Sequence, residues 1–457
     1  MNEKDNRRPS GNPKRGKPPA PRHPAKPGYA ARAAAAKLLS AVIDQKTSLD
    51  GMLDDDHGNP AYSALPPADR GLVRAILNSC LRHQIFIDSI FADFVDKPLP
   101  EGARNLRHIL SIAAAQILFL DVPDHSAVDI AVEQARRDPR SSRFANLVNA
   151  LLRRLTREKD AILAKLEAGF APFPAWFMDR LIAQYGEDHA RAIAIACATP
   201  APIDLTVKGE PEKWAETLGG TVTETGSVRL GTFDGAVSAL PGFTEGEWWV
   251  QDAAARIPAR LMGDINGKRV ADLCAAPGGK TAQLALAGAH VVAVEQSANR
   301  LKRLRGNLAR LGLEAEYQQS RLEDLKPDTL FDAVLLDAPC SSTGTIRRHP
   351  DVLFTKGPED IAKLAEVQLR LLRSAFELIG PGGRLVFSNC SLDASEGEDL
   401  IAEFLATEPR AERISVLAEA FPDLAPAITE DGAIRTTPAM LGGMDGFYAC
   451  ILQRGEA

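Results

Sequence analysis

The sequence predicts a multidomain protein with an all-helical domain first, a small α/β subdomain next, and an α/β domain with a mostly parallel sheet last. Apolar residues recur at helical spacing from about residue 30 to 159, and short extended segments begin near residue 203. From about residue 267, apolar strands alternate with helical patterns. A length of 457 residues allows several domains, and we place their bounds at residues 1–27, 28–160, 161–245 and 246–457.

The first 27 residues are rich in Pro, Lys, Arg and Gly, and we expect them to be a disordered basic tail. The whole chain carries a formal charge of −6, whereas Lys and Arg far outnumber Asp and Glu in this tail, so the tail is a region of net positive charge on an acidic chain. The tail can act as a solubilising segment or can capture RNA phosphates, and the sequence does not choose between these roles.

The helical domain is predicted from four amphipathic segments. They are Ala31–Ile43, Asp69–Phe94, Leu106–Leu120 and Phe144–Leu155. Pro123 and Pro139 interrupt the pattern. The last segment runs into Arg153, Arg154 and Arg157, which suit either an RNA surface or a solvated helix face.

A connecting helical stretch, Phe173–Ala198, precedes the predicted small subdomain. That subdomain is expected to have a helix near Glu210–Leu218 and short strands around it. The strand candidates are Ile203–Val207, Thr221–Glu224, Val228–Leu230 and Ala236–Leu240.

The final domain alternates predicted strands with predicted helices. The strand candidates are Arg269–Leu273, His290–Glu295, Glu314–Gln318, Ala333–Asp337 and Arg384–Ser388. The helix candidates are Lys280–Leu286, Ala298–Leu311 and Pro358–Leu378. Such alternation is typical of a parallel sheet with helices on both faces, where ligands bind at the carboxyl ends of the strands.

Composition excludes several classes of protein. Hydrophobic residues make up 45% of the chain, yet no apolar run reaches the length of a membrane span, and the N-terminus lacks the apolar core of a secretory signal. The six cysteines are scattered without a CxxC pair, which argues against a disulfide framework and a structural zinc site. We therefore expect a cytoplasmic protein without a membrane or metal partner.

A glycine turn follows the first predicted strand of the final domain, in the segment Val270-Ala-Asp-Leu-Cys-Ala-Ala-Pro-Gly-Gly-Lys280. It matches neither the phosphate-binding GxxxxGK[ST] pattern nor GxGxxG. The next strand ends at Glu295, where a carboxylate can bind ribose hydroxyls. Together these features suit a nucleoside without phosphates, such as S-adenosyl-L-methionine, although a structural turn beside a surface Glu remains an alternative.

Two cysteines follow two other predicted strands, in Asp337-Ala-Pro-Cys340 and Ser388-Asn-Cys390. A thiolate that adds to C6 of a cytosine makes C5 nucleophilic enough to accept a methyl group, and a second thiol can assist its release. Asp337 can hydrogen-bond the base near N3. Either cysteine alone is more often a small core residue, which is how we interpret Cys274 and the remaining three, Cys80, Cys197 and Cys450.

At these residues the sequence resembles the Sun-type RNA cytosine-5 methyltransferases, and within them the branch that modifies bacterial 16S ribosomal RNA. The matching segments are Asp272–Thr281, Leu336–Ser341, Thr345–Asp351, Asn389–Ser391, Trp249–Ala254 and Asp445–Ala449. The N-terminal helices resemble the antitermination-factor-like RNA-binding domain of this branch. The likeness spans about residues 30–455, and it implies a Rossmann-like methyltransferase domain with S-adenosyl-L-methionine as cofactor.

The resemblance also implies roles for individual residues. Cys390 matches the nucleophile, and Cys340 the thiol that aids product release. Asp337 and Lys280 match groups near the target base, and Asp337 also serves the cofactor. The cofactor positions are Cys274, Ala275, Ala276, Pro277, Gly278, Gly279, Lys280 and Glu295. The expected partner is 16S ribosomal RNA, naked or in an early assembly intermediate, bound by a monomer.

The sequence departs from the family pattern at two positions. Arg321 stands where an Asp near the adenine is usual, with Glu323 or Asp324 as substitutes, and Asn389 replaces the commoner Thr. The segment Arg347-Arg-His349 is expected to face the RNA. The target cytosine must leave its stack in that RNA, by base flipping or in an open loop. For His349 a structural hydrogen bond is equally expected. The alternatives are the same chemistry on transfer RNA or DNA, or a non-catalytic RNA-binding or antitermination protein.

Overall fold

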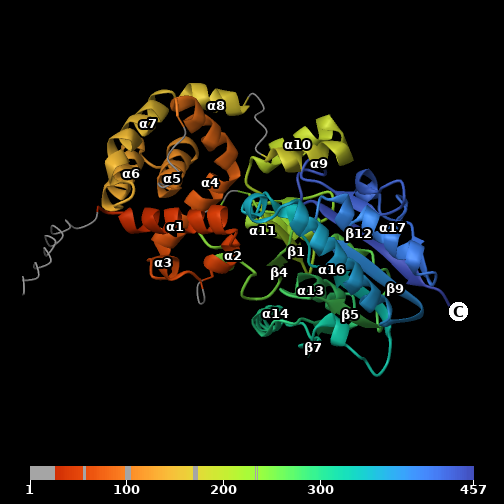
Figure 1. Ribbon diagram of the computed structural model, residues 1–457. Helices are drawn as coiled ribbons and strands as arrows, with labels where there is room; N and C mark the ends of the chain where they lie inside the picture. The colour runs from red at the N-terminus through yellow and green to blue at the C-terminus, as the bar shows by residue number, and fades with distance from the viewer. Residues whose placement is uncertain are drawn as a thin grey trace, which may run out of the picture.

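The computed structural model describes residues 26–54, 58–97, 104–167, 173–231, 233 and 235–456. The expected basic tail, residues 1–27, therefore lies almost entirely outside the described residues. Figure 1 shows a helical domain beside a larger domain built on a sheet, as the sequence predicts. No helix within these described ranges is both long and apolar enough to cross a membrane.

Eight helices are described in the first domain. Their bounds are α1 Tyr29–Gln45, α2 Leu49–Met52, α3 Pro60–Ser63, α4 Pro67–Phe94, α5 Arg104–Phe119, α6 Asp124–Arg137, α7 Ala145–Arg157 and α8 Lys159–Glu167. Leu38, Ile76 and Ile117 are fully buried between α1, α4 and α5. The all-helical prediction is confirmed. Pro123 and Pro139 lie between helices, as predicted, and α6 between them has no counterpart among the four predicted segments.

The connecting stretch forms two helices, α9 Ala175–Tyr185 and α10 Glu187–Cys197. Gly186 separates them with a φ of 79°, a left-handed conformation that glycine adopts without steric cost. Phe177 and Ile193 from these helices pack with Leu392 of the sheet domain. The stretch is therefore part of the wall beside the carboxyl edge of the large sheet.

The small subdomain is a four-stranded antiparallel sheet with one helix, in the strand order β2-β3-β1-β4. The bounds are β1 Asp204–Val207, α11 Pro211–Leu218, β2 Thr221–Val222, β3 Val228–Arg229 and β4 Trp248–Val250. The strand expected at Ala236–Leu240 is wrong, since Val237–Ala239 forms a 3-10 turn. Pro241 follows it and offers no N–H to a sheet, and β4 takes the place beside β1 instead.

The large sheet has the order β10-β12-β9-β8-β5-β6-β7, and β11 pairs with β12. Its strands are β5 Arg269–Leu273, β6 His290–Val294, β7 Glu316–Gln318, β8 Phe331–Asp337, β9 Ile379–Asn389, β10 Ala411–Ile414, β11 Ile434–Thr436 and β12 Phe447–Arg454. Strands β5 to β9 pair in parallel, whereas β12 is antiparallel to β9. The predicted Rossmann-like fold is confirmed, and β10 to β12 extend it.

Helices cover both faces of this sheet. Their bounds are α12 Ile257–Arg260, α13 Gly279–Leu286, α14 Ala298–Leu311, α15 Val352–Thr355, α16 Pro358–Phe376 and α17 Glu398–Thr407. Alternate strand residues point to opposite faces. Thus Leu336 packs with α16 and α17, whereas Leu335 packs with α12 and α13.

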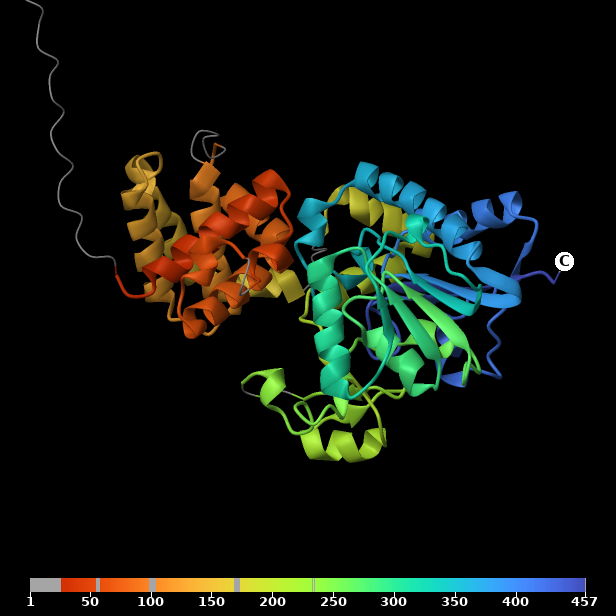
Figure 2. The same ribbon diagram turned by 90° about the horizontal axis from the view of Figure 1, so that it is seen from below.

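The helical domain contacts the sheet domain beside the catalytic loops. The backbone N–H of Leu49 donates to Asp351 Oδ2 at 2.9 Å, and Arg303 Nη2 on α14 lies 3.2 Å from Asp54 Oδ2. Figure 2 shows the helical domain and the small subdomain against different sides of the sheet domain, with α14 on the side that faces the helices.

Candidate active site

The carboxyl ends of four neighbouring strands carry most of the predicted site. Leu273 at the end of β5 is in register with Val294 of β6 and Leu336 of β8, and Asp337 is in register with Ser388 of β9. The glycine turn, Glu295, Asp337 and Cys390 each follow or end one of these strands. The parallel pairing therefore brings residues that are far apart in the sequence to one edge.

Cys340 and Cys390 are in direct contact, with their Sγ atoms 3.4 Å apart. Cys390 Sγ also lies 3.7 Å from Ser342 Oγ. The hydrogen bond between the thiols lowers the pKa of Cys390 below that of a free thiol, and it raises the pKa of Cys340. The arrangement favours a thiolate on Cys390 beside a protonated Cys340.

The backbone around the thiols is tightly packed. Ser342 holds a φ of 62°, which side chains other than glycine rarely adopt. The N–H of Gly344 donates to the carbonyl of Cys390 at 2.9 Å, and a Cβ on Gly344 would lie 1.9 Å from the carbonyl oxygen of Gly446. Only glycine allows three chain segments to approach this closely.

Lys280 and Asp337 form an ion pair beside the thiols. Lys280 Nζ lies 2.8 Å from Asp337 Oδ2, and Ser388 Oγ donates to Asp337 Oδ1 at 3.0 Å. Lys280 is also 5.1 Å from the ring centroid of Phe447. The carboxylate is thus fixed on both oxygens. Neither Ser388 nor Phe447 was predicted as a site residue, because nothing in the sequence places them beside Asp337.

The glycine turn is held from behind by α14. Gly278 has a φ of 103°, and a Cβ there would lie 3.0 Å from Leu308 Cδ1. Arg300 Nη2 donates to the carbonyl of Ala276, and Asn307 Nδ2 to that of Pro277, both at 2.8 Å. The turn is therefore preformed.

Two cavities flank this turn and share Cys274, Ala276 and Asp337. The larger, about 450 Å³, reaches Glu295, Arg321 and both thiols. The smaller, about 340 Å³, runs past Lys280 towards the small subdomain. Cys274, expected to be a packing residue, lines both cavities, and burial raises its pKa to about 12.

The larger cavity fits a nucleoside-bearing ligand. Glu295 is 2% exposed, and its Oε2 accepts no hydrogen bond, although Arg300 Nη1 forms an ion pair with it at 3.2 Å. A buried carboxylate oxygen with spare acceptor capacity suits a ribose hydroxyl. Arg321 lines the same cavity and lies 3.4 Å from Glu323 Oε1, so a carboxylate is present near the position where the family has Asp.

The segment expected to face RNA is largely engaged within the protein. Arg348 pairs with Asp252 and Asp445, and burial raises the pKa of Asp445 to about 7. His349 Nδ1 lies 3.3 Å from Asp50 Oδ1, which agrees with a structural hydrogen bond. No local pattern indicates that Asp252 and Asp445, which are far apart along the chain, pair with one guanidinium.

Comparison with known proteins matches two parts of the chain to families. Residues 260–453 match the model described as 16S rRNA methyltransferase RsmB/F, and residues 29–157 match the NusB family. The ribosomal RNA small subunit methyltransferase B of Vibrio vulnificus is 32% identical over 446 residues, which cover 92% of this chain and 98% of that protein. Its counterpart from Pseudomonas syringae is 35% identical over 441 residues, covering 91% and 95%.

A solved structure shares the fold of nearly the whole chain. The crystal structure of PH0851 superimposes with a TM-score of 0.71 and covers 95% of this chain and 100% of its own. At 22% identity this likeness concerns the fold alone.

Proposed function

The chain belongs to the RsmB/F family of 16S rRNA methyltransferases and is an S-adenosylmethionine-dependent RNA methyltransferase. From the geometry of its site, we propose that it methylates C5 of a cytosine in 16S rRNA through a covalent bond between Cys390 and C6. The pair of thiols 3.4 Å apart at the cofactor edge carries this proposal. A cysteine that only packs in the core would not need a second thiol in contact with it.

Residues around the larger cavity would hold the cofactor. Glu295 would accept hydrogen bonds from the ribose, and the backbone of the glycine turn, Cys274 to Lys280, would pass close to the ligand. When bound, S-adenosylmethionine supplies an electrophilic methyl group.

The residues of the chain prepare the cytosine for that methyl group. The Cys390 thiolate forms a bond to C6, which transfers electron density to C5. Asp337, fixed by Lys280 and Ser388, would hold the base at its N3 edge, and the Lys280 ammonium paired with it would stabilise the negative charge that the attack places on the ring. After methylation, Cys340, having released its own proton to solvent, would take the proton from C5. The electrons of the C5–H bond re-form the C5–C6 double bond as the C6–S bond breaks and releases the Cys390 thiolate.

Substitution of each thiol tests this assignment. Cys390→Ala should lower methyl transfer to 16S RNA at least about 1,000-fold, because covalent activation of the base is lost. Cys340→Ala should instead accumulate a protein–RNA adduct that survives denaturant. Cofactor affinity, measured by calorimetry, should stay within a few-fold in both variants and serves as the control for folding.

The outcomes separate the competing functions. A stable adduct only with Cys390→Ala would exchange the roles of the two thiols. Methylation of transfer RNA but not of 16S RNA, naked or in assembly intermediates, would replace the substrate. Bisulfite mapping of 16S RNA from cells with and without the gene would locate the modified cytosine, and an unchanged pattern would contradict the proposal.

A further inference from the structure

Glu396 is a fully buried carboxylate next to the thiol loops, in the 3-10 turn Ala394–Glu396. It accepts four hydrogen bonds within the protein. Oε1 accepts from the backbone N–H of Ser341 at 2.9 Å and from Gln368 Nε2 at 2.8 Å. Oε2 accepts from the hydroxyls of Ser341 and Ser391, the latter at 2.6 Å.

The two serines are the residues that directly follow the two thiols in the sequence. Ser341 follows Cys340, and Ser391 follows Cys390. Both hydroxyls donate to the same carboxylate oxygen and lie 3.3 Å from each other. One carboxylate thus joins two loops that leave different strands of the sheet.

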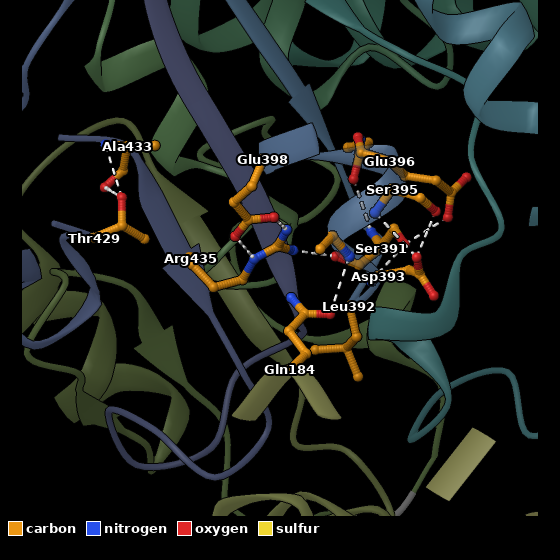
Figure 3. Close-up of polar contacts among 12 residues, drawn as sticks. Gln184, Ser391, Leu392, Asp393, Ser395, Glu396, Glu398, Thr429, Ala433 and Arg435 are labelled. Carbon is orange, nitrogen blue, oxygen red and sulfur yellow. Dashed lines mark hydrogen bonds and ion pairs between the residues drawn. The ribbon is translucent and has the colours of Figure 1, made fainter. Parts of the chain in front are cut away.

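The loop that carries Cys390 is also fixed from its far side. Figure 3 shows Arg435 against Ser391, where Arg435 Nη1 donates to the carbonyl of Ser391 and the guanidinium pairs with Glu398. Gln184 of α9 accepts from the N–H of Ala394 at 3.0 Å. Asn389 donates to the carbonyl of Glu396 and to Gln368. The Cys390 loop is therefore also held from outside. Thr343 and Gly344 of the Cys340 loop bond to it, through the N–H of Leu392 and the carbonyl of Cys390, whereas Glu396 holds Ser341, the residue next to Cys340.

A carboxylate is an expensive group to bury for packing alone. All four donors on Glu396 are neutral, so the buried charge is solvated by dipoles rather than by a cation in contact with it. A hydrophobic residue could fill the same volume, but it could not connect two hydroxyls. The charge is well suited to fixing the distance between the two loops.

We propose that Glu396 is a positioning residue that sets the separation of Cys340 and Cys390 by joining Ser341 and Ser391. The effect of this separation on catalysis rests on the proposed function, whereas the control of the thiol–thiol distance by Glu396 does not depend on it. Thr343 and Gly344 stay attached to the Cys390 loop without the carboxylate, so its loss frees Ser341, lets the adjacent Cys340 shift and weakens the hydrogen bond that favours the Cys390 thiolate.

The test compares Glu396→Gln with Asp399→Asn, which removes an exposed acid from the adjoining helix α17. The distance readout is phenylarsine oxide, which binds tightly only when two thiols can reach one arsenic atom. We expect capture in the wild type and in Asp399→Asn, and at least about tenfold weaker capture in Glu396→Gln. Cys340→Ala, which cannot chelate, gives the background.

A second readout follows the thiolate. The rate of Cys390 alkylation by iodoacetamide, measured by peptide mass spectrometry against pH, should shift to higher pH in Glu396→Gln, because the hydrogen bond from Cys340 is lost. For methyl transfer we expect kcat to fall by about tenfold or more, with KM for RNA and cofactor affinity nearly unchanged. A residue that only supports the fold would lower the melting temperature without moving the pH profile.

Unchanged arsenical capture and an unchanged alkylation profile in folded Glu396→Gln would overturn the proposal. If that variant does not fold, Ser391→Ala and Ser341→Ala each remove one hydrogen bond to Glu396, and the same two readouts then test the positioning role. Wild-type protein that captures the arsenical but methylates no RNA would refute the proposed function and leave the positioning role of Glu396 standing.

Discussion

The carboxyl edge of the large sheet has a cofactor half, at the ends of β5 and β6, and a thiol half, at the ends of β8 and β9. The two halves differ in whether their buried carboxylate oxygens have hydrogen-bond partners. In the cofactor half, Asp272 Oδ1 and Glu295 Oε2 are buried and accept no hydrogen bond. In the thiol half, both oxygens of Glu396 accept two each. The first half keeps capacity for a ligand, whereas the second is complete before any ligand arrives, as preorganised catalysis requires.

The largest effect that would sharpen this comparison is expected at the glycine turn. Gly278→Ala should weaken cofactor binding about 100-fold, because the left-handed backbone and the contact with Leu308 force the turn to shift. Arsenical capture by the thiols should not change. Gly306→Ala on α14, where a new Cβ meets nothing within 4 Å, is the matched control. If Gly278→Ala binds the cofactor within threefold of wild type, the distinction between the two halves does not hold.

A smaller effect is expected at Glu295, the carboxylate that we propose binds the ribose. Glu295→Gln should weaken cofactor binding about tenfold, because a hydrogen bond to a charged acceptor is worth about 1.5–3 kcal/mol, more than one to a neutral amide. Calorimetry with Glu316→Gln, an exposed acid on the next strand β7, gives the control. If both variants bind the cofactor like wild type, the spare oxygen of Glu295 does not serve the ligand.

The last prediction concerns stability rather than binding: it lies at the buried acid beneath the turn, and it depends on pH. Burial raises the pKa of Asp272 to about 7, although Thr281 donates a hydrogen bond to it. The folded state therefore holds a proton that the unfolded chain releases near pH 4, so the stability from this group is present at low pH and is lost as pH rises towards 7.

Asp272→Asn should remove this pH dependence. The difference in unfolding free energy between wild type and variant, followed by urea titration from pH 5 to 8, should move in favour of the variant as pH rises, by an amount on the order of a few kcal/mol. A constant difference across that range would show that Asp272 is ionised throughout.

Much of the catalytic domain could be predicted from the sequence because its signals are local. The apolar segment Arg269–Leu273 and the amphipathic segment Ala298–Leu311 coincide with β5 and α14, since strand and helix periods are visible within one element. The turn residues and both thiols could be placed at one edge because parallel strands align their carboxyl ends. Their individual roles were supplied by resemblance and stay predictions until the variants are measured.

Long-range contacts could not be predicted in this way. Glu396 lies in an acidic segment, Asp393-Ala-Ser-Glu-Gly-Glu-Asp399, that reads as a solvated surface, yet it is fully buried against Ser341. Strands β10 to β12 were missed because two of them are very short and β12 is an apolar run without alternation. Their pairing depends on chain segments far away in the sequence.

The placement of β12 has a consequence for biosynthesis. Strand β12 lies between β9 and β10 in the sheet. Strand β9, which ends beside Cys390, therefore has a partner on only one side until residues 390–446 and then β12 have left the ribosome. During that interval the nascent chain displays an apolar, unpaired strand edge, which is prone to aggregate. The strand that leads into Cys390 therefore becomes part of a finished sheet only late in translation, and a chaperone that covers this strand edge would protect the chain until β12 pairs with it.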